Sequence, residues 1–305
     1  FAQGTTYSVT YQHPTESDLK GEIDSVLHDF DKSLSTYDST SIISAINRNE
    51  PGVRTDSLFR AVFRESARVY QLSGGAFDIT LAPIIDAWGF GPGEQMELDS
   101  ATVDSLLQFV GMEKVALAGD TIWKSHPGVT LNVNAIAQGF AVDVVAAYLE
   151  ELDCRNYMVE VGGEIRTRGM NPKGNFWRIG VDRPDFGNMI PGQQLQVIIS
   201  MHNRALATSG NYRKFYEKDG VRITHTIDPS TGFPKESRLL SVTVLTGNCM
   251  SADAYATACM AMGLEKAQRF IESLDRTDAY LIYGDDFGNY QVWHTDGLRK
   301  YIESP

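Results

Sequence analysis

Between Tyr157 and about Leu245 the chain passes through one strand-like segment after another, with turns between them. The segments are short and rich in β-branched and aromatic residues, which is typical of strands. Helices and strands do not alternate regularly, as they would in a doubly wound fold. The pattern predicts an α+β fold with mostly antiparallel sheets and packed helices, not a Rossmann fold. The predicted strands are Tyr157–Val161, Trp177–Asp182, Leu195–Met201, Ala205–Ser209, Val221–Ile227 and Leu239–Leu245.

Helical spacing of apolar residues appears on both sides of this region. Asp56 and Ser251 are of the residue types that cap helix N-termini, and we expect each to begin a helix. No repeat or linker divides the chain, so we expect a single domain over 1–305, or two closely packed sub-domains. The remaining expectations are a strand over Thr5–Gln12, helices over Ser17–Ser35, Asp56–Leu72, Asn134–Leu152 and 251–274, an ordered loop over 76–100, and a hairpin of Ala279–Tyr283 with Tyr290–His294.

Composition excludes some classes of function. The 305 residues are 42% hydrophobic and 22% charged, which is a globular composition. No apolar run approaches the roughly 18 residues that suggest a membrane span. The formal net charge of −12 argues against a nucleic-acid partner, because phosphate binding requires a basic patch. The three cysteines show no pairing pattern, and the Phe at position 1 suggests a processed chain.

Asp253 and Thr257 are four residues apart in the segment SADAYATA. On a helix, this spacing places both side-chain oxygens on one face, where they could hold a hard cation such as Mg²⁺. The alternative is an ordinary first helical turn, with an acidic residue favoured by the helix dipole and a threonine bonded to the backbone. The spacing alone favours this alternative.

Eight segments, in the same order, give the chain a resemblance to the ApbE family of FAD:protein FMN transferases over nearly its whole length. Each segment alone is a weak signal, and their order makes the resemblance strong. They are QGTTYSV at 3–9, STYDSTSIISAIN at 35–47, GGAFDITLAPIIDAWGFG at 74–91, LNVNAIAQGFAVD at 131–143, VEVGGEIRTRG at 159–169, ATSGNY at 207–212, HTIDPSTGFP at 225–234 and SADAYATA at 251–258.

The resemblance implies an Mg²⁺-dependent enzyme that cleaves the pyrophosphate of FAD. It would transfer FMN to a Thr or Ser hydroxyl of a target protein and release AMP. The implied targets are flavin-carrying subunits of membrane redox complexes. The implied location is the periplasmic side of the bacterial inner membrane, through a lipid anchor that this chain lacks. Phosphoryl transfer depends on positioning and charge neutralisation, and the chain has neither a Walker A nor a GxGxxG motif to hold phosphates.

The resemblance also implies the residues of the site. The implied metal ligands are Asp253, Thr257, Ala256 and the backbone carbonyl of Ala135. With the resemblance, a metal site at SADAYATA becomes the favoured interpretation over an ordinary first helical turn. His225 and Asp253 would be the catalytic residues, although a hydrogen-bonded turn histidine is an equally good interpretation of His225. The implied cofactor-binding residues are Gln3, Tyr37, Ala76, Phe77, Asp78, Asn132, Gln138, Thr208, Ser209, Gly210, Thr226 and Ile227.

Several of these residues have structural alternatives. Tyr37 and Phe77 would ordinarily be interpreted as core residues. Residues 208–210 could equally form a plain turn at a strand end.

The chain departs from the family pattern near the predicted phosphates. Asn132 and Gln138 stand where the family usually has Asp and Lys, and Gln3 stands where it usually has Met. A glutamine offers only neutral hydrogen bonds in place of a lysine charge. Our hypothesis is that positions 132 and 138 exchanged their charges together and that FAD binding is retained. An FAD pyrophosphatase that uses water as acceptor, and a non-catalytic FAD-binding protein, remain alternative functions.

Overall fold

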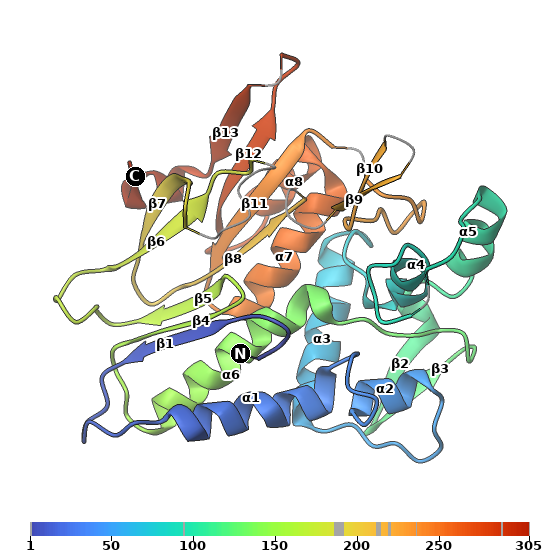
Figure 1. The fold of residues 1–305 in the computed structure, drawn as a ribbon, viewed down its shortest axis with the longest axis horizontal. Helices are drawn as coiled ribbons and strands as arrows, with labels where there is room; N and C mark the ends of the chain where they lie inside the picture. The colour runs from blue at the N-terminus through green and yellow to red at the C-terminus, as the bar shows by residue number, and fades with distance from the viewer. Residues whose placement is uncertain are drawn as a thin grey trace.

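The computed structural model describes residues 2–93, 95–185, 192–211, 215–218, 221–235, 237–287 and 289–304. Its centre is a seven-stranded sheet in which every neighbouring pair of strands is antiparallel (Figure 1). The predicted α+β class is therefore confirmed. The strands, in spatial order, are β1 (Tyr7–Tyr11), β4 (Tyr157–Val161), β5 (Glu164–Arg168), β8 (Ala205–Gly210), β11 (Leu239–Thr246), β12 (Asp278–Gly284) and β13 (Tyr290–His294).

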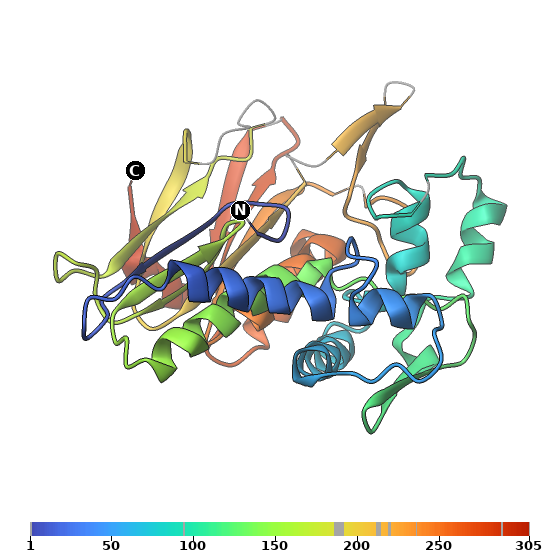
Figure 2. The ribbon, with the colours of Figure 1, turned by 60° about the horizontal axis from the view of Figure 1, so that its bottom comes forward.

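Helices cover one face of this sheet, and a smaller sheet covers the other (Figures 1 and 2). Strand β8 shows how one segment serves both sides. Ala205 and Ala207 lie in the core beneath the helices, whereas Leu206 between them belongs to the core shared with the smaller sheet. This is the two-residue alternation of a strand that is buried on both faces. The smaller sheet contains β6 (Trp177–Asp182), β7 (Leu195–Met201) and β14 (Ile302–Glu303).

Two long helices lie against the seven-stranded sheet and carry all the predicted metal ligands. They are α6 (Asn134–Glu151) and α7 (Cys249–Met262); both are rich in alanine, α7 is buried along most of its length, and α6 at half of its residues. A helix that is apolar on all sides is typical of a protein interior. Around them pack α1 (Lys20–Leu34), α2 (Ile42–Asn47), α3 (Ser57–Leu72) and α8 (Leu264–Glu272).

A third hydrophobic cluster forms to one side of the sheets, around Ile84 and Val103 of two short helices. The segment that follows β10 joins this cluster through Ile227. The elements of this region are η1 (Ile79–Leu81), α4 (Ala82–Ala87) and α5 (Ser100–Leu107). The other short elements are η2 (Met112–Lys114), the hairpins β2 (Val115–Ala118) with β3 (Thr121–Lys124) and β9 (Phe215–Lys218) with β10 (Val221–Thr224), and η3 (Asp296–Tyr301).

Several predicted boundaries were wrong. The helix predicted over 251–274 is two helices, because Gly263 has a φ of +80° between α7 and α8. Asn248, rather than Ser251, caps α7. The strand predicted over Val221–Ile227 ends at Thr224. The ordered loop predicted over 76–100 contains η1 and α4.

The remaining long elements agree with prediction to within a few residues. These are the strands at 157–161, 177–182, 195–201, 205–210 and 239–246, the helices α1, α3 and α6, and the closing hairpin. Among the described helices, none is long and apolar enough to cross a membrane.

Candidate functional site

The site is built where α7 crosses α6 at Gly139. A side chain cannot be accommodated there, since a Cβ on Gly139 would lie 2.3 Å from the carbonyl oxygen of Cys249 and 2.8 Å from Cβ of Asp253. The glycine lets the two backbones approach closely. As a result, the amide of Gly139 donates a hydrogen bond to Oδ2 of Asp253 at 3.0 Å.

The predicted metal ligands lie around this crossing. In an α-helix the amide of residue 139 points toward the carbonyl of residue 135. The Asp253 carboxylate and the Ala135 carbonyl therefore approach the same N–H group. Thr257 lies one turn further along α7, and its Oγ1 is 3.3 Å from Oγ of Ser209 on β8. Ala256 is buried, and because its side chain is a methyl group, its backbone carbonyl is the group that could bind a metal.

Asp253 is 6% exposed, and burial raises its pKa to about 7, against the opposing effect of the Gly139 hydrogen bond. The Gly139 amide donates the hydrogen bond that the Asp253 carboxylate accepts from the described residues. A bound cation would favour the ionised form of the carboxylate.

The donor chemistry fits magnesium. No cluster of three His, Cys, Asp or Glu side chains occurs in the described part of the chain. A cation at this point would instead meet one carboxylate, one hydroxyl and one carbonyl. These are oxygen ligands, which Mg²⁺ prefers, and Mg²⁺ commonly takes one or two carboxylates together with substrate phosphates. The residues therefore fit the implied metal.

The 76–80 loop is fastened to the start of α6. Phe77 is buried, and the backbone amide of Asn132 donates to the carbonyl of Ile79 at 2.8 Å. Oδ1 of the buried Asn132 in turn accepts from the amide of Asn134 at 2.9 Å. The half-buried Ala76 precedes Phe77 in the same loop. The predicted cofactor-binding loop is thus adjacent to the helix end that carries Ala135.

Asp78 in this loop is also a carboxylate with a shifted pKa. Burial raises its pKa to about 6, and two hydrogen bonds from Thr80 oppose the shift. Oδ1 of Asp78 accepts from the amide of Thr80 at 2.7 Å and from its Oγ1 at 2.6 Å. The same Oγ1 accepts from the amide of Gly111 at 2.6 Å. Asp78 therefore caps η1 and organises the loop.

The structure separates the side chains of Thr208 and Ser209, which were predicted together with Gly210. Ser209 faces α7, where it meets Thr257. Thr208 lies on the opposite face of the sheet, with its Oγ1 2.9 Å from Oγ1 of Thr243. Because neighbouring residues of a strand point to opposite faces, only the Ser209 side chain reaches the helix face.

His225 lies in a different part of the fold from Asp253. It follows β10, and its ring meets Phe90 edge to face with centroids 6.3 Å apart. The carbonyl of Thr226 accepts from the amide of Lys235 at 2.8 Å, and Ile227 is 4% exposed in the third hydrophobic cluster. The segment that carries His225 is therefore anchored on the α4–α5 side.

The remaining predicted residues have varied surroundings. Nε2 of Gln3 donates to Oδ1 of Asp31 at 2.6 Å. Tyr37 is 67% exposed, which excludes a core role for its side chain. Gln138 lies against the β4–β5 turn, since a Cβ on Gly162 would be 2.7 Å from its Nε2. Within the described residues no hydrogen bond joins Gln138 to Asn132, so the hypothesis of an exchanged pair has no direct contact to support it.

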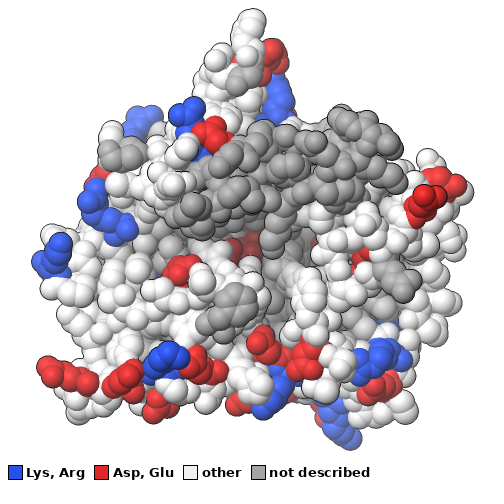
Figure 3. Space-filling view, viewed as in Figure 1, with Lys and Arg blue, Asp and Glu red and all other residues white. Residues whose placement is uncertain are grey.

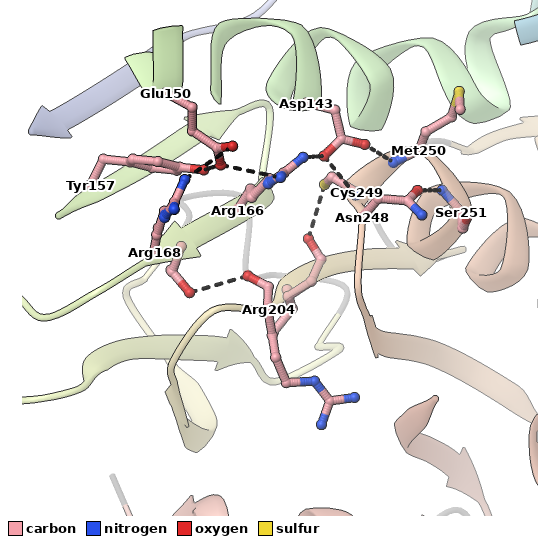
Figure 4. Close-up of polar contacts among 12 residues, drawn as sticks. Asp143, Glu150, Tyr157, Arg166, Arg168, Arg204, Asn248, Cys249, Met250 and Ser251 are labelled. Carbon is pink, nitrogen blue, oxygen red and sulfur yellow. Dashed lines mark hydrogen bonds and ion pairs between the residues drawn. The ribbon is translucent and has the colours of Figure 1, made fainter. Parts of the chain in front are cut away.

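Sequence reasoning missed a polar network next to the site (Figure 4). The Asp143 carboxylate accepts from the amides of Cys249 and Met250 at the start of α7 and pairs with Arg166 at 2.8 Å. A signal was present, because Asp143 is a charged residue inside the apolar run AVDVVAA. Buried charges are rare unless they are paired.

Figure 3 shows that the face of the molecule seen in Figure 1 is hollowed near its centre. Among the described residues, the charged atoms visible within the hollow are those of Asp or Glu, and Lys and Arg lie toward the rim. Carboxylates repel a diphosphate unless a cation lies between them.

Comparison with known proteins gives a consistent result. The model of the ApbE family matches residues 3–281. A protein of Vibrio cholerae named FAD:protein FMN transferase is 38% identical over 311 residues, covering 99% of this chain and 88% of that protein. A protein of the same name from Haemophilus influenzae is 35% identical over 316 residues, covering 99% and 90%.

A solved structure described as the flavin transferase ApbE from Vibrio cholerae superposes with a TM-score of 0.88. The two chains are 35% identical, and the match covers 98% of this chain and 96% of that one. The ApbE protein of Thermotoga maritima has a TM-score of 0.85 at 25% identity, over 99% and 97% of the two chains. The family model, the relatives and the solved structures agree over nearly the whole length, and the chain belongs to the ApbE family.

Proposed function

We propose that this protein is an Mg²⁺-dependent FAD:protein FMN transferase. It transfers the FMN half of FAD to a Thr or Ser hydroxyl of a target protein and releases AMP. The observation that carries the proposal is the buried Asp253 carboxylate, which accepts a hydrogen bond from the Gly139 amide of α6, with Thr257 on the same face of α7. The family relationship supplies the reaction.

The reaction is a phosphoryl transfer whose atoms balance without a further reactant. The acceptor hydroxyl oxygen forms a bond to the phosphorus of the FMN half, the bond from that phosphorus to the bridging oxygen breaks, and AMP departs. The hydroxyl proton passes to a base, for which His225 is the candidate. Mg²⁺ bound at Asp253 and Thr257 would neutralise the negative charge that spreads over the phosphate oxygens.

The residues of the chain supply the positioning. Asp253 is held in one orientation by Gly139, and Ser209 places a second hydroxyl next to Thr257. Asn132 and Gln138 offer amides near the start of α6. Phosphoryl transfer depends mainly on such fixed placement, because the protein itself takes little part in bond making.

The first experiment is an incubation with FAD, Mg²⁺ and a protein domain that carries a candidate acceptor Thr. AMP release and acceptor mass are followed together. We expect AMP and an acceptor heavier by FMN in equal amounts. Asp253→Asn should lower both by at least about 100-fold, as expected when an electrostatic contribution of several kcal/mol is lost.

The matched control is Asp120→Asn, which removes an exposed carboxylate paired with Arg54. It should leave both products unchanged. AMP release without acceptor labelling across several acceptors would identify an FAD pyrophosphatase. FAD binding with no product would identify a non-catalytic FAD-binding protein.

We further propose that the acceptor is a flavin-carrying subunit of a membrane redox complex, and that the mature protein works at the periplasmic side of the inner membrane through a lipid anchor. The support is family resemblance. Expression of the full-length precursor followed by membrane fractionation and protease treatment of spheroplasts tests the location. A precursor product found only in the cytosolic fraction would contradict it.

A further inference from the structure

Three amides at the start of α7 have acceptors outside the helical ladder, and two of them are bound by another helix. The first four amides of a helix, beginning with that of the N-cap residue, have no acceptor within the helix. The amide of Ser251 donates to Oδ1 of the N-cap residue Asn248 at 2.8 Å. The amides of Cys249 and Met250 both donate to the carboxylate of Asp143 on α6, at 3.0 and 2.8 Å.

The contact between Asp143 and the start of α7 mirrors the contact between Asp253 and Gly139 at the candidate metal site. Asp143 lies four residues after Gly139 on α6, and Cys249 lies four residues before Asp253 on α7. In one contact the α6 backbone donates to the α7 side chain, and in the other the α7 backbone donates to the α6 side chain. Two contacts one turn apart on antiparallel helices fix both the rotation and the sliding of α7 against α6.

Arg166 fixes the Asp143 carboxylate in place (Figure 4). Its Nη1 donates to Oδ1 of Asp143 at 2.8 Å, and its Nη2 donates to Oε1 of Glu150 at 3.3 Å. Glu150 also accepts from the hydroxyl of Tyr157 and pairs with Nη1 of Arg168 at 3.1 Å. The orientation of Asp143 is thus set by residues of β4 and β5 in the seven-stranded sheet.

A largely buried ion pair contributes little to stability relative to an apolar pair of the same size. The Arg166–Asp143 pair is largely buried, with its side chains 24% and 10% exposed. Its location at the capped end of α7 indicates a geometric task rather than a contribution to stability. The helix it orients carries Asp253 one turn further on.

We propose that Asp143 and Arg166 are positioning residues for the metal site. They hold the register of α7 against α6, and thereby keep the Asp253 carboxylate beside the carbonyl of Ala135. The inference rests on the proposed function, because it assigns the two residues to the metal site of that reaction. Neither residue touches the reacting atoms.

The test compares metal affinity and thermal stability in matched variants. Arg166→Met and Asp143→Asn remove the ion pair, and Arg166→Lys retains a charge. Arg204→Met is the control, because Arg204 pairs with Asp278 at 2.5 Å with similar exposure, 22% and 16%, and its guanidinium also donates to the carbonyls of Leu245 and Arg276, which lie outside α6 and α7. Mn²⁺ binding to each purified protein is measured from the electron paramagnetic resonance signal of free Mn²⁺, beside the melting temperature.

We expect Arg166→Met and Asp143→Asn to weaken Mn²⁺ binding by about 10-fold or more, as for the loss of a residue that orients a metal ligand. Arg166→Lys should recover part of the affinity. Arg204→Met should lower the melting temperature to a similar extent and leave Mn²⁺ affinity within about twofold, since distant sites act independently.

Equal Mn²⁺ affinity in Arg166→Met and the unmodified protein would overturn the inference, provided that Asp253→Asn abolishes binding. Such a result would leave the proposed metal site intact. If Asp253→Asn has no effect on Mn²⁺ binding, the metal assignment in the proposed function and this inference both fail. The Asp253→Asn measurement therefore separates the two failures.

Discussion

At the scale of single residues, Asp253 and Asp78 are desolvated carboxylates with different partners. Asp253 is bonded to the amide of another helix, and burial raises its pKa to about 7. Asp78 is bonded twice to Thr80 within its own turn, and burial raises its pKa to about 6. The partners of Asp78 are thus local, so its charge can be removed without disturbing the contact between α6 and α7.

Asp78→Asn should change stability in a way that depends on pH. The raised pKa means that folding favours the protonated carboxyl. The stability that this contributes is present below the unfolded-state pKa of 3.8 and is lost as pH rises through about 6. Asparagine carries no charge, and its oxygen can accept the same two bonds from Thr80. We expect the variant to be more stable by about 1–2 kcal/mol at pH 8, with the difference closing near pH 4.

Urea unfolding at the two pH values measures this difference. A stability difference that is the same at pH 4 and pH 8 would show that the charge of Asp78 is not the cause. Thr80→Val leaves the carboxyl in place and removes the hydroxyl that donates to Asp78 and accepts from the Gly111 amide, so it should lower stability at both pH values.

Part of the candidate site could be predicted from single residues, and part could not. The spacing of Asp253 and Thr257 predicts one helix face, and α7 places them so. The network of Asp143 was missed because its partners, Arg166 and the start of α7, are distant in sequence. The cap was assigned to Ser251 because serine and asparagine both suit that position, and only the backbone shows that the helix begins earlier.

At the scale of elements, the crossing of α6 and α7 at Gly139 determines the site. Hydrophobic periodicity predicted α3 and α6 nearly to the residue, because both are long and α3 has a clear Asp cap. It did not find the break at Gly263, since the apolar pattern continues through it. It also missed short elements such as α2 and β2, which tertiary contacts stabilise more than their own sequence does.

Gly139→Ala should destabilise the protein by about 1–3 kcal/mol, because the added methyl overlaps the Cys249 carbonyl and forces the helices apart. Alanine is intrinsically a better helix former than glycine, so the loss would come from the crossing alone. The matched control is Gly21→Ala in α1, where a Cβ meets nothing within 4 Å. It should leave stability unchanged or raise it by up to about 0.5 kcal/mol.

Chemical denaturation of both variants measures these changes. If Gly139→Ala leaves the free energy of unfolding unchanged, the two helices can move apart without loss of stability. The same variant should also weaken the Asp253 hydrogen bond, which Mn²⁺ affinity would report.

At the scale of the whole molecule, the seven-stranded sheet is a partition between two cores. The helices with the predicted metal ligands lie on one side, and the three-stranded sheet lies on the other (Figure 2). The segment with His225 crosses to the third cluster, where Ile227 packs with residues of η1, α4 and α5. The overall α+β class was predictable, but this arrangement was not, because it depends on which distant segments share a core.

Ile227→Ala should lower both stability and turnover. Large-to-small changes in a core cost about 2–5 kcal/mol, and here the cavity would loosen the anchor of the His225 segment. The control is Ile179→Ala. Ile179 of β6 is buried to about the same extent as Ile227, but in the core on the other side of the sheet. It should cost similar stability and leave kcat unchanged well below the melting temperature.

FAD turnover and the melting temperature of both variants show whether the Ile227 anchor affects turnover separately from stability. Equal losses of kcat would mean that turnover follows general stability. Retained kcat in Ile227→Ala would mean that the position of the His225 segment does not depend on this anchor.

The paired contacts between α6 and α7 also constrain how the chain can vary in length. An insertion of one residue between Gly139 and Asp143 would turn everything after it by about 100° around the helix axis. Asp143 would then no longer face the start of α7 while Gly139 still faced Asp253. The same holds for a deletion between Cys249 and Asp253. These two stretches are therefore poor sites for insertions and deletions, even where single substitutions within them are accepted.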